Sequence, residues 1–361
     1  MIKSDTILVE HTSRSRLSGI NFNELEFGKY ISDHMVVADY AHGKWSQPAI
    51  VPYGELSLSP AMLSLHYGQS VFEGMKAYKM KDGHISIFRV GKHHQRLNRS
   101  LERMCMPEIP EQMFVEALHA LVALDSDWVP ATEGASLYIR PLVFASEARL
   151  GVKISDQYKF VVMTTPVGPY FSKPYRLKIE DHYVRTAEGG TGFAKCAGNY
   201  GGAFYPTHLA RQQGFDQVLW TDHKTHSYID EVGMMNVMFV INGTLVTPRL
   251  NTAILDGVTR DSILVLAREM GFPVEERSVQ VDELETAFRN GTMREAFGTG
   301  TAAVVAPIQT IHFRGEDHSI GPPAADSFQL TVKRKLWDIR TGVCEDKYGW
   351  NHIIQLNKLH P

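Results

Sequence analysis

One lysine lies among small residues, where its amine could act as a nucleophile. Lys195 belongs to the glycine-rich segment 189–202, and a phenol, Tyr200, follows five positions later. These surroundings are too apolar for a solvated loop, so they would partly desolvate the amine and lower its pKa. Such an amine can attack a carbonyl carbon and form a Schiff base. A surface lysine in a flexible glycine loop is the alternative interpretation.

A single carboxylate opens an apolar run later in the chain. Glu231 is followed by Val-Gly-Met-Met, ending at Asn236. Burying an unpaired carboxylate is costly, so Glu231 needs a cationic partner. A lysine together with a distant carboxylate is the minimum set of side chains for holding pyridoxal phosphate.

Three further segments could bind a phosphate group. Residues 256–260 directly precede a predicted helix, whose free N–H groups would attract an anion, although an ordinary helix cap is the alternative. Residues 298–302 superficially match the dinucleotide fingerprint, but 303–308 predict a strand broken by proline where that fingerprint needs a helix, so we interpret them as an anion cradle. Arg96 could contact phosphate through two N–H groups, or simply belong to a solvated basic helix.

Composition limits the classes of function. At 361 residues, 43% hydrophobic and 21% charged, the chain is long enough for two domains with cores of their own. The net charge of −3 gives no reason to expect nucleic acid or a membrane as partner. The absence of an 18-residue apolar run and of a signal peptide predicts a cytoplasmic protein. Three scattered cysteines, and a His223/His226 pair without a third ligand nearby, predict no metal site.

The pattern of elements predicts an α+β protein. In the first part, strands over 76–80 and 84–88 flank Asp82-Gly83, a type I′ hairpin signal, and further strands are predicted over 136–144 and 159–165. Helices are predicted over 92–104 and from Pro110, taken as a first-turn proline. Residues 166–174 have the turn composition of a connector.

The second part mixes strands and helices as well. A strand over 177–184 precedes the lysine segment, and a helix is predicted from there to about residue 213. Strands follow over 217–221 and 236–241, the latter turning at Asn242-Gly243 into a second hairpin. Helices are predicted over 259–270, ended by Gly271, and over 282–289. Hairpins in both parts favour α+β over a doubly wound parallel sheet.

Several segments resemble the branched-chain amino acid aminotransferases, a fold-type IV group of pyridoxal phosphate enzymes. The matching segments run in unbroken order from 28 to 307: residues 28–35, 65–68, 72–78, 138–141, 168–171 and the segments of Lys195, Glu231, Gly257 and Gly298. The resemblance implies two domains, a smaller N-terminal α/β domain (1–170) and a larger C-terminal domain with a mixed sheet or pseudo-barrel (184–361), joined by a connector (171–183).

The resemblance also assigns cofactor contacts. It makes Lys195 the Schiff-base lysine and proton shuttle of pyridoxal 5'-phosphate, and Glu231 the partner of the pyridine nitrogen. Tyr200 would hydrogen-bond the phenolic oxygen of the cofactor. The remaining contacts are to the phosphate and to one face of the ring: Arg96, the N–H groups of Val258 and Thr259, the Thr301 hydroxyl, and Leu255 on the ring.

The substrate residues are implied in the same way. Apolar walls would come from Phe72, Tyr138, Tyr170 and a Tyr67 contributed by a partner subunit, so the active unit is expected to be at least a homodimer. Arg140 would meet the γ-carboxylate of glutamate, and the N–H of Ala302 the substrate α-carboxylate.

The implied reaction is ping-pong transfer of the amino group of L-leucine, L-isoleucine or L-valine to 2-oxoglutarate. The alternatives are the shorter D-amino acid aminotransferases and aminodeoxychorismate lyases, which would be expected to lack segments 72–78 and 138–141 as written here. A non-catalytic binding protein of this fold would be expected to lack Lys195 or Glu231.

Overall fold

The chain forms two compact units. The computed structural model describes residues 7–169 and 173–356. Among these, 7–169 and 337–356 form the first unit and 173–336 form the second. Both units combine helices with a sheet, which confirms the predicted α+β class. None of the helices in the described ranges is long and apolar enough to cross a membrane.

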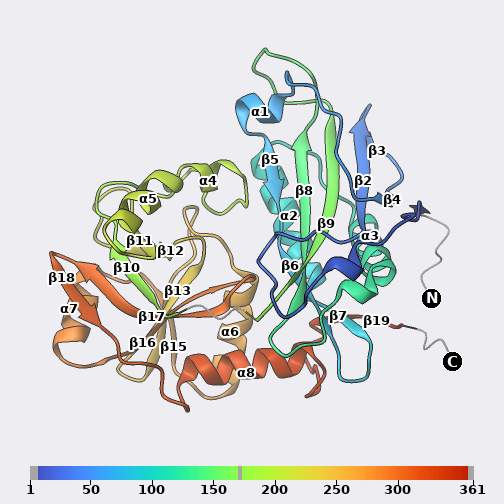
Figure 1. Cartoon of the computed structure of the whole chain (residues 1–361). Coiled ribbons are helices and arrows are strands. Elements are labelled where there is room, and N and C mark those ends of the chain that lie inside the picture. The colour runs from blue at the N-terminus through green and yellow to red at the C-terminus, as the bar shows by residue number, and fades with distance from the viewer. Residues whose placement is uncertain (1–6, 170–172, 357–361) are drawn as a thin grey trace. The chain divides into compact units, whose positions relative to one another are not determined.

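The first unit is built on one large, mainly antiparallel sheet (Figure 1). Its strands follow the order β1-β4-β2-β9-β8-β6-β7-β19, with β3 paired to β2 and β5 paired to β8. The β1–β4 pair is parallel. The strand bounds are Leu8–Val9 (β1), His34–Ala41 (β2), Lys44–Trp45 (β3), Ala49–Pro52 (β4), Ser70–Phe72 (β5), Met75–Lys79 (β6), Ile85–Phe88 (β7), Ser136–Ala145 (β8), Tyr158–Val167 (β9) and Asn351–Ile354 (β19).

Two long helices pack on this sheet. Helix α2 (Val90–Arg103) contacts β5, α3 (Glu111–Leu124) contacts β2, and the two helices contact each other. The buried side of α3 is apolar, whereas that of α2 combines Leu97 and Leu101 with polar residues such as Arg96. Phe160 of β9 packs against Phe114 of α3. A one-turn helix, α1 (Leu63–Tyr67), and the short 3₁₀ segments Leu17–Gly19 and Ser126–Trp128 complete the unit.

Two predicted details of the first unit are wrong. Only Gly83 of the Asp82-Gly83 pair has a positive φ, whereas a type I′ turn requires both, so the β6–β7 connection is a turn closed by the Gly83 N–H to Met80 oxygen bond (3.0 Å) with a left-handed glycine. Pro110 is the N-cap of α3, one position before the first turn. Its ψ of 137° is extended and leaves the helix to begin at Glu111.

The second unit has a curled, mixed sheet (Figure 1). The order is β12-β11-β10-β17-β16-β13-β14-β15, with β18 on β17; β10 is parallel to both β11 and β17, and β14 is parallel to β15. The strands are Tyr175–Ile179 (β10), Gln217–Thr221 (β11), Ile229–Val232 (β12), Asn236–Ile241 (β13), Thr244–Pro248 (β14), Val274–Arg277 (β15), Met293–Gly300 (β16), Val304–Phe313 (β17) and Glu316–Ser319 (β18).

Helices connect and cover these strands. Their bounds are Gly198–Gly201 (α4), Phe204–Gln212 (α5), Val258–Glu269 (α6), Val281–Arg289 (α7) and Phe328–Arg340 (α8), which runs from the second unit into the first. Branched and aromatic residues of the sheet, such as Leu177, Leu219 and Phe239, form the centre of the core together with Leu284 of α7.

Most predicted elements of the second unit are present, with three differences. The predicted strand over 177–184 ends at Ile179, and the helix after the lysine is divided into α4 and α5. Pro307 does not break the strand that contains it, because it lies inside β17 opposite Phe297. The prediction that a strand, not a helix, follows residues 298–302 is confirmed, and with it the rejection of the dinucleotide fingerprint.

The domain limits 1–170, 171–183 and 184–361 stay a prediction, and the compact units differ from them in two places. Strand β10 falls inside the predicted connector, because it pairs with β11 and β17 of the second unit. The C-terminal strand β19 pairs antiparallel with β7, so the segment from Trp337 belongs to the first unit.

Candidate functional site

The loop that carries Lys195 is held by side-chain hydrogen bonds. The Nζ of Lys195 donates to the Tyr200 hydroxyl at 2.9 Å. Asn199, next to Tyr200, donates to the backbone oxygens of Thr191 (2.8 Å) and Ala194 (2.9 Å), and the Thr191 hydroxyl donates back to the Asn199 amide oxygen (2.7 Å). The buried side chain of Asn199 thus bonds to both ends of the turn, and this fixes the backbone position of Lys195.

The lysine loop is in close contact with the loop over 251–255. A Cβ added at Gly192 would lie 2.2 Å from the Ala253 oxygen, so only glycine fits there. The Phe193 N–H donates to the Thr252 oxygen at 3.1 Å, and the Gly189 N–H donates to the Thr252 hydroxyl at 2.8 Å. The two loops therefore form one packed structure.

Glu231 lies on β12 with only 3% of its surface exposed. Arg185 forms an ion pair with one carboxylate oxygen at 2.6 Å. The Asn236 amide donates to the other oxygen at 2.9 Å, and the Leu255 N–H donates to the same oxygen at 3.3 Å. Because the Asn236 amide also donates to the Leu255 oxygen at 2.9 Å, Leu255 is fixed beside the carboxylate.

The charges around Glu231 connect it to the lysine. Burial raises the pKa of Glu231, and this is only partly opposed by Arg185, the Leu255 N–H, Lys195 and Arg260. The Lys195 ammonium and the Arg260 guanidinium are therefore close enough to stabilise the Glu231 carboxylate electrostatically. The two residues that the sequence singled out first, Lys195 and Glu231, lie in one electrostatic environment.

Helix α6 begins beside the same carboxylate. Gly257 is its N-cap, and a Cβ there would lie 2.0 Å from the Asn236 amide oxygen, so the helix start is pressed against the Glu231 partner. Val258 and Thr259 are buried, and their N–H groups have no acceptor within the helix because they belong to its first turn. This is an anion-binding geometry.

Thr301 and Ala302 lie in the turn that joins β16 to β17. The register pairs Asn236 of β13 with Thr299 of β16. Thr301 is therefore two residues beyond Thr299, the strand neighbour of Asn236, which contacts Glu231. Every predicted cofactor residue except Arg96 belongs to the second unit, as does Ala302; these cofactor residues are Lys195, Tyr200, Glu231, Leu255, Val258, Thr259 and Thr301.

Three predicted substrate residues form a cluster in the first unit. The Arg140 guanidinium lies over the Phe72 ring (4.6 Å to its centroid) and the Tyr138 ring (5.2 Å), and it donates to the Tyr138 hydroxyl at 3.1 Å. A Cβ at Gly74 would lie 1.9 Å from that hydroxyl, so Gly74 makes room for it. Phe27, which is half exposed, packs edge-on against Tyr138.

Arg96 lies in the first unit too, in a buried ion cluster. It contacts Glu73 through two nitrogens, Nε to one oxygen at 2.6 Å and a terminal nitrogen to the other at 2.8 Å. His93 also contacts Glu73 at 2.8 Å, and the Gly74 N–H donates to it at 3.0 Å. The solvated basic helix face is therefore wrong for Arg96, which is only 4% exposed. Its phosphate contact stays a prediction.

The last two predicted substrate residues are tyrosines. Tyr67, at the end of α1, is 43% exposed and its hydroxyl donates to the Leu150 oxygen. Tyr170 lies outside the described residues.

Two residues that contact the predicted site residues could not be identified from the sequence. Arg185 is the cation that Glu231 was expected to need, and Glu73 is the acid beneath Arg96. Arg185 is the first arginine before the lysine loop. The isolated acid Glu231 indicated that a cationic partner was needed. Nothing in the sequence pattern indicated which of the 37 basic residues that cation would be.

Comparisons with known proteins identify the family of the chain. The family model for amino-transferase class IV matches residues 70–311. Branched-chain-amino-acid aminotransferase 2 of Bacillus subtilis (strain 168) is 44% identical over 349 residues, which is 96% of each chain. The Escherichia coli branched-chain amino acid aminotransferase structure has a TM-score of 0.73 at 25% identity and covers 90% of this chain and 99% of its own.

A second solved structure carries a bound molecule. It is a T.th. branched-chain amino acid aminotransferase complexed with N-(5'-phosphopyridoxyl)-L-glutamate, with a TM-score of 0.70, 26% identity, and coverage of 88% of this chain and 98% of its own. The family match, the relative's identity over nearly the whole chain and the shared fold lead to one assignment. The chain belongs to the class IV aminotransferases, and among them to the fold-type IV branched-chain-amino-acid aminotransferase family.

Proposed function

We propose that the protein catalyses reversible transfer of the amino group of L-leucine, L-isoleucine or L-valine to 2-oxoglutarate, with pyridoxal 5'-phosphate as cofactor. Fold-type IV aminotransferases use this cofactor. The observation that carries the proposal is the Lys195 amine, 2.9 Å from the Tyr200 hydroxyl, in one electrostatic environment with the buried carboxylate of Glu231.

The donor set of the second unit fits this cofactor group by group. An amine is present for the aldehyde, a phenol for the ring oxygen, a buried acid for the ring nitrogen and a helix start for the phosphate. When bound, pyridoxal phosphate supplies an aldehyde that accepts the amino group and a protonated ring that withdraws electrons from the substrate α-carbon.

The residues of the chain have separate tasks in this proposal. Lys195 Nζ moves the proton that leaves the substrate α-carbon, and the Tyr200 hydroxyl holds Nζ in position. Arg185 and Asn236 keep the Glu231 carboxylate ionised and oriented. Val258 and Thr259 offer first-turn N–H groups to the phosphate, joined by Thr301 and Arg96.

Substrate selection needs a pocket that accepts both an aliphatic side chain and a second carboxylate. The rings of Phe72 and Tyr138, with Tyr170, are proposed as the apolar walls, and Arg140 as the contact of the γ-carboxylate of glutamate. Arg140 lies on two aromatic faces and one phenol, and it forms no ion pair with an acidic residue of the described ranges. The Ala302 N–H is proposed for the α-carboxylate.

The experiment that tests the function is a spectral half-reaction assay with Lys195→Ala. The wild-type protein is expected to be yellow, and its visible band to change when L-leucine is added but not with D-leucine. In Lys195→Ala the band is expected to be lost or displaced, and turnover to fall by more than about 1,000-fold, because a nucleophile and a proton carrier are removed together.

The matched control is Lys178→Ala, which removes a lysine of the same unit that contacts Gln213 at 2.9 Å. Its visible band and turnover are expected to equal those of the wild type. Retained turnover in Lys195→Ala would contradict the proposed function, and a response to the D-isomers would favour the D-amino acid aminotransferase alternative.

We propose in addition that the protein is a homodimer and that Tyr67 reaches the partner's site. Large apolar side chains near Tyr67 are exposed on the first unit: Leu65 (65%), Leu150 (66%), Val152 (80%) and Ile154 (58%). Exposed clusters of this kind are typical of protein interfaces. Sedimentation of Val152→Asp is expected to show monomers, and Val343→Asp, a comparably exposed control at 54%, to stay dimeric; two dimeric variants would contradict the assignment of the surface.

A further inference from the structure

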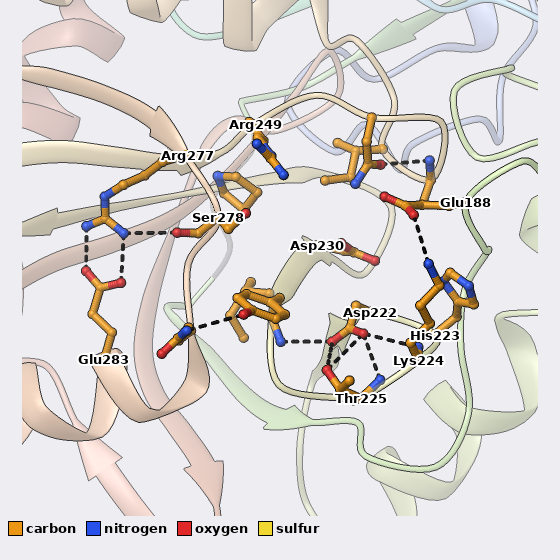
Figure 2. A pocket seen from close by; sticks show the side chains of 17 residues that line it. Glu188, Asp222, His223, Lys224, Thr225, Asp230, Arg249, Arg277, Ser278 and Glu283 are labelled. Carbon is orange, nitrogen blue, oxygen red and sulfur yellow. Dashed lines mark hydrogen bonds and ion pairs between the residues drawn. The ribbon is translucent and has the colours of Figure 1, made fainter.

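A polar cavity in the second unit is lined by Asp230, the sequence neighbour of Glu231. Its lining contains neither Glu231 nor Lys195, although Asp230 and Glu231 are consecutive residues of β12 at a register shift against β11. The cavity has a volume of about 640 Å³, within the range of small-molecule sites. Figure 2 shows its lining, which comes from the segments 222–230, 248–254 and 277–283 together with Glu188.

Most charged groups of the lining are compensated within the protein. Asp222 accepts hydrogen bonds from four backbone N–H groups of its own turn, which lower its pKa to about 2. Arg277 pairs with Glu283 through two nitrogens at 2.5 and 2.8 Å, and Lys224 pairs with Glu188 at 3.5 Å. The charges of these lining residues are compensated within the protein, so they are not available to a ligand.

Asp230 is the exception. Its side chain is 9% exposed, and it has no hydrogen bond or ion pair with any residue in the described ranges. Burial, followed by the negative charge of Glu231, raises the pKa of Asp230 to about 7; Arg185 opposes this, and Asp222 and Glu188 add to it. An unpartnered buried carboxyl costs free energy, so a cationic donor from outside would be strongly favoured here.

Two basic side chains without a partner among the described residues line the same cavity. Arg249 and His223 make no side-chain hydrogen bond or ion pair with the described part of the chain, and Arg249 is exposed. In the view of Figure 2 the Asp230 carboxyl lies between them. The cavity therefore presents a buried acceptor and, at its edge, a free guanidinium that prefers carboxylates.

We propose that this cavity binds a small ampholyte, a molecule that carries both a protonated amine and a carboxylate, with the ammonium on Asp230 and the carboxylate on Arg249. A metal ion fits less well, because no three His, Cys, Asp or Glu side chains within 7–169 and 173–356 are grouped as ligands. The site is separate from Lys195 and does not depend on transamination.

Binding at Asp230 has a proton signature. A carboxyl with a pKa of about 7 is about half protonated at pH 7, and an ammonium group beside it favours the ionised form. Ligand binding at pH 7 therefore releases about half a proton, and release falls to nearly zero at pH 9, where Asp230 is already ionised. An ordinary exposed aspartate would release none at pH 7.

The test is calorimetric titration of the holoenzyme with N,N-dimethylglycine, a tertiary amine that cannot form an imine with an aldehyde. Titrations in buffers of different ionisation enthalpy measure the protons released. Binding with a Kd of about 1 mM or tighter and release of about half a proton at pH 7 are expected. Isobutyrate, which has the carboxylate but no amine, is expected to release none.

Three variants complete the test. Asp230→Asn is expected to abolish proton release and weaken binding at least tenfold, whereas Arg249→Ala, at an exposed position, is expected to weaken binding about tenfold and keep the release. Lys195→Ala is expected to bind as the wild type does although it does not transaminate, which separates this site from the proposed function. Absence of binding, unchanged binding in both Asp230→Asn and Arg249→Ala, or loss of binding in Lys195→Ala would overturn the proposal.

Discussion

Each unit contains a buried glutamate paired with an arginine, yet the two pairs have opposite electrostatic behaviour. Glu73 of the first unit is fully buried, and Arg96 and His93 hold its pKa well below the usual range. Glu231 of the second unit is almost as buried, but its pKa is raised despite the contact with Arg185 at 2.6 Å.

The difference lies in the number of donors. Glu73 has four donors: two nitrogens of Arg96, the His93 ring and the Gly74 N–H. Glu231 receives one arginine nitrogen, one amide and a long N–H bond of 3.3 Å. The carboxylate with more donors has the structural role, whereas Glu231, with fewer donors, can still accept a proton donor from a ligand. This comparison supports Glu231 as the partner of a ring nitrogen.

The largest effect is expected for Glu73→Gln. Removing one charge of a buried pair leaves Arg96 uncompensated, so the free energy of unfolding is expected to fall by about 3–5 kcal/mol. Denaturant unfolding measures it. The matched control Glu147→Gln affects a partly exposed contact with Lys153 at 3.1 Å and is expected to cost at most about 1 kcal/mol. Equal losses of unfolding free energy in the two variants would contradict the structural role of Glu73.

Glu231→Gln should separate activity from stability. The kcat is expected to fall by about 100- to 1,000-fold, because the carboxylate proposed to pair with the ring nitrogen of the cofactor becomes a neutral amide. The cofactor is expected to stay bound. Single-turnover kinetics with L-leucine measure the effect.

Glu295→Gln is the control for Glu231→Gln. It alters a buried glutamate of the same unit, one that accepts the Phe328 and Gln329 N–H groups at the start of α8. Its kcat is expected to stay within about threefold of the wild type. A Glu231→Gln enzyme with near-normal kcat would remove the proposed role of the carboxylate.

Arg140 extends the comparison to an arginine that lies on aromatic rings. Arg140→Ala is expected to slow the 2-oxoglutarate half-reaction about tenfold to 100-fold more than the L-leucine half-reaction, because only the former brings a second carboxylate. The exposed Arg149→Ala serves as control. Equal losses in both half-reactions would contradict the assignment of Arg140.

Two hairpins show how far local sequence determines local structure. Asn242 and Gly243 both have positive φ (49° and 75°), as the predicted type I′ turn requires. Asp82-Gly83 carries the same kind of signal, but only Gly83 is left-handed (89°). The loop between β6 and β7 has five residues and the one between β13 and β14 has two, and loop length, set by strand register, selects the turn.

The site residues also fall into two groups, those that the local sequence predicts and those that it does not. Lys195 and Glu231 could be predicted because a cation among glycines and an acid in an apolar run are unusual on their own. Arg185 and Glu73 could not, because their function depends on contacts across 46 and 23 positions that only the folded sheet creates. Asp230 could not be predicted for another reason: its sequence neighbour Glu231 explained the acidic character of the segment, and only the folded chain shows that Asp230 lines a separate cavity.

The pairing of β19 with β7 has a consequence for the order in which the molecule can be completed. Residues 85–88 emerge during synthesis long before residues 351–354, and the whole second unit lies between them. Until the last strand arrives, the rim of the early sheet is open to any other extended chain. The strand over 85–88 therefore stays open to mispairing during synthesis until residues 351–354 arrive, and deletion of those residues would make the open edge permanent.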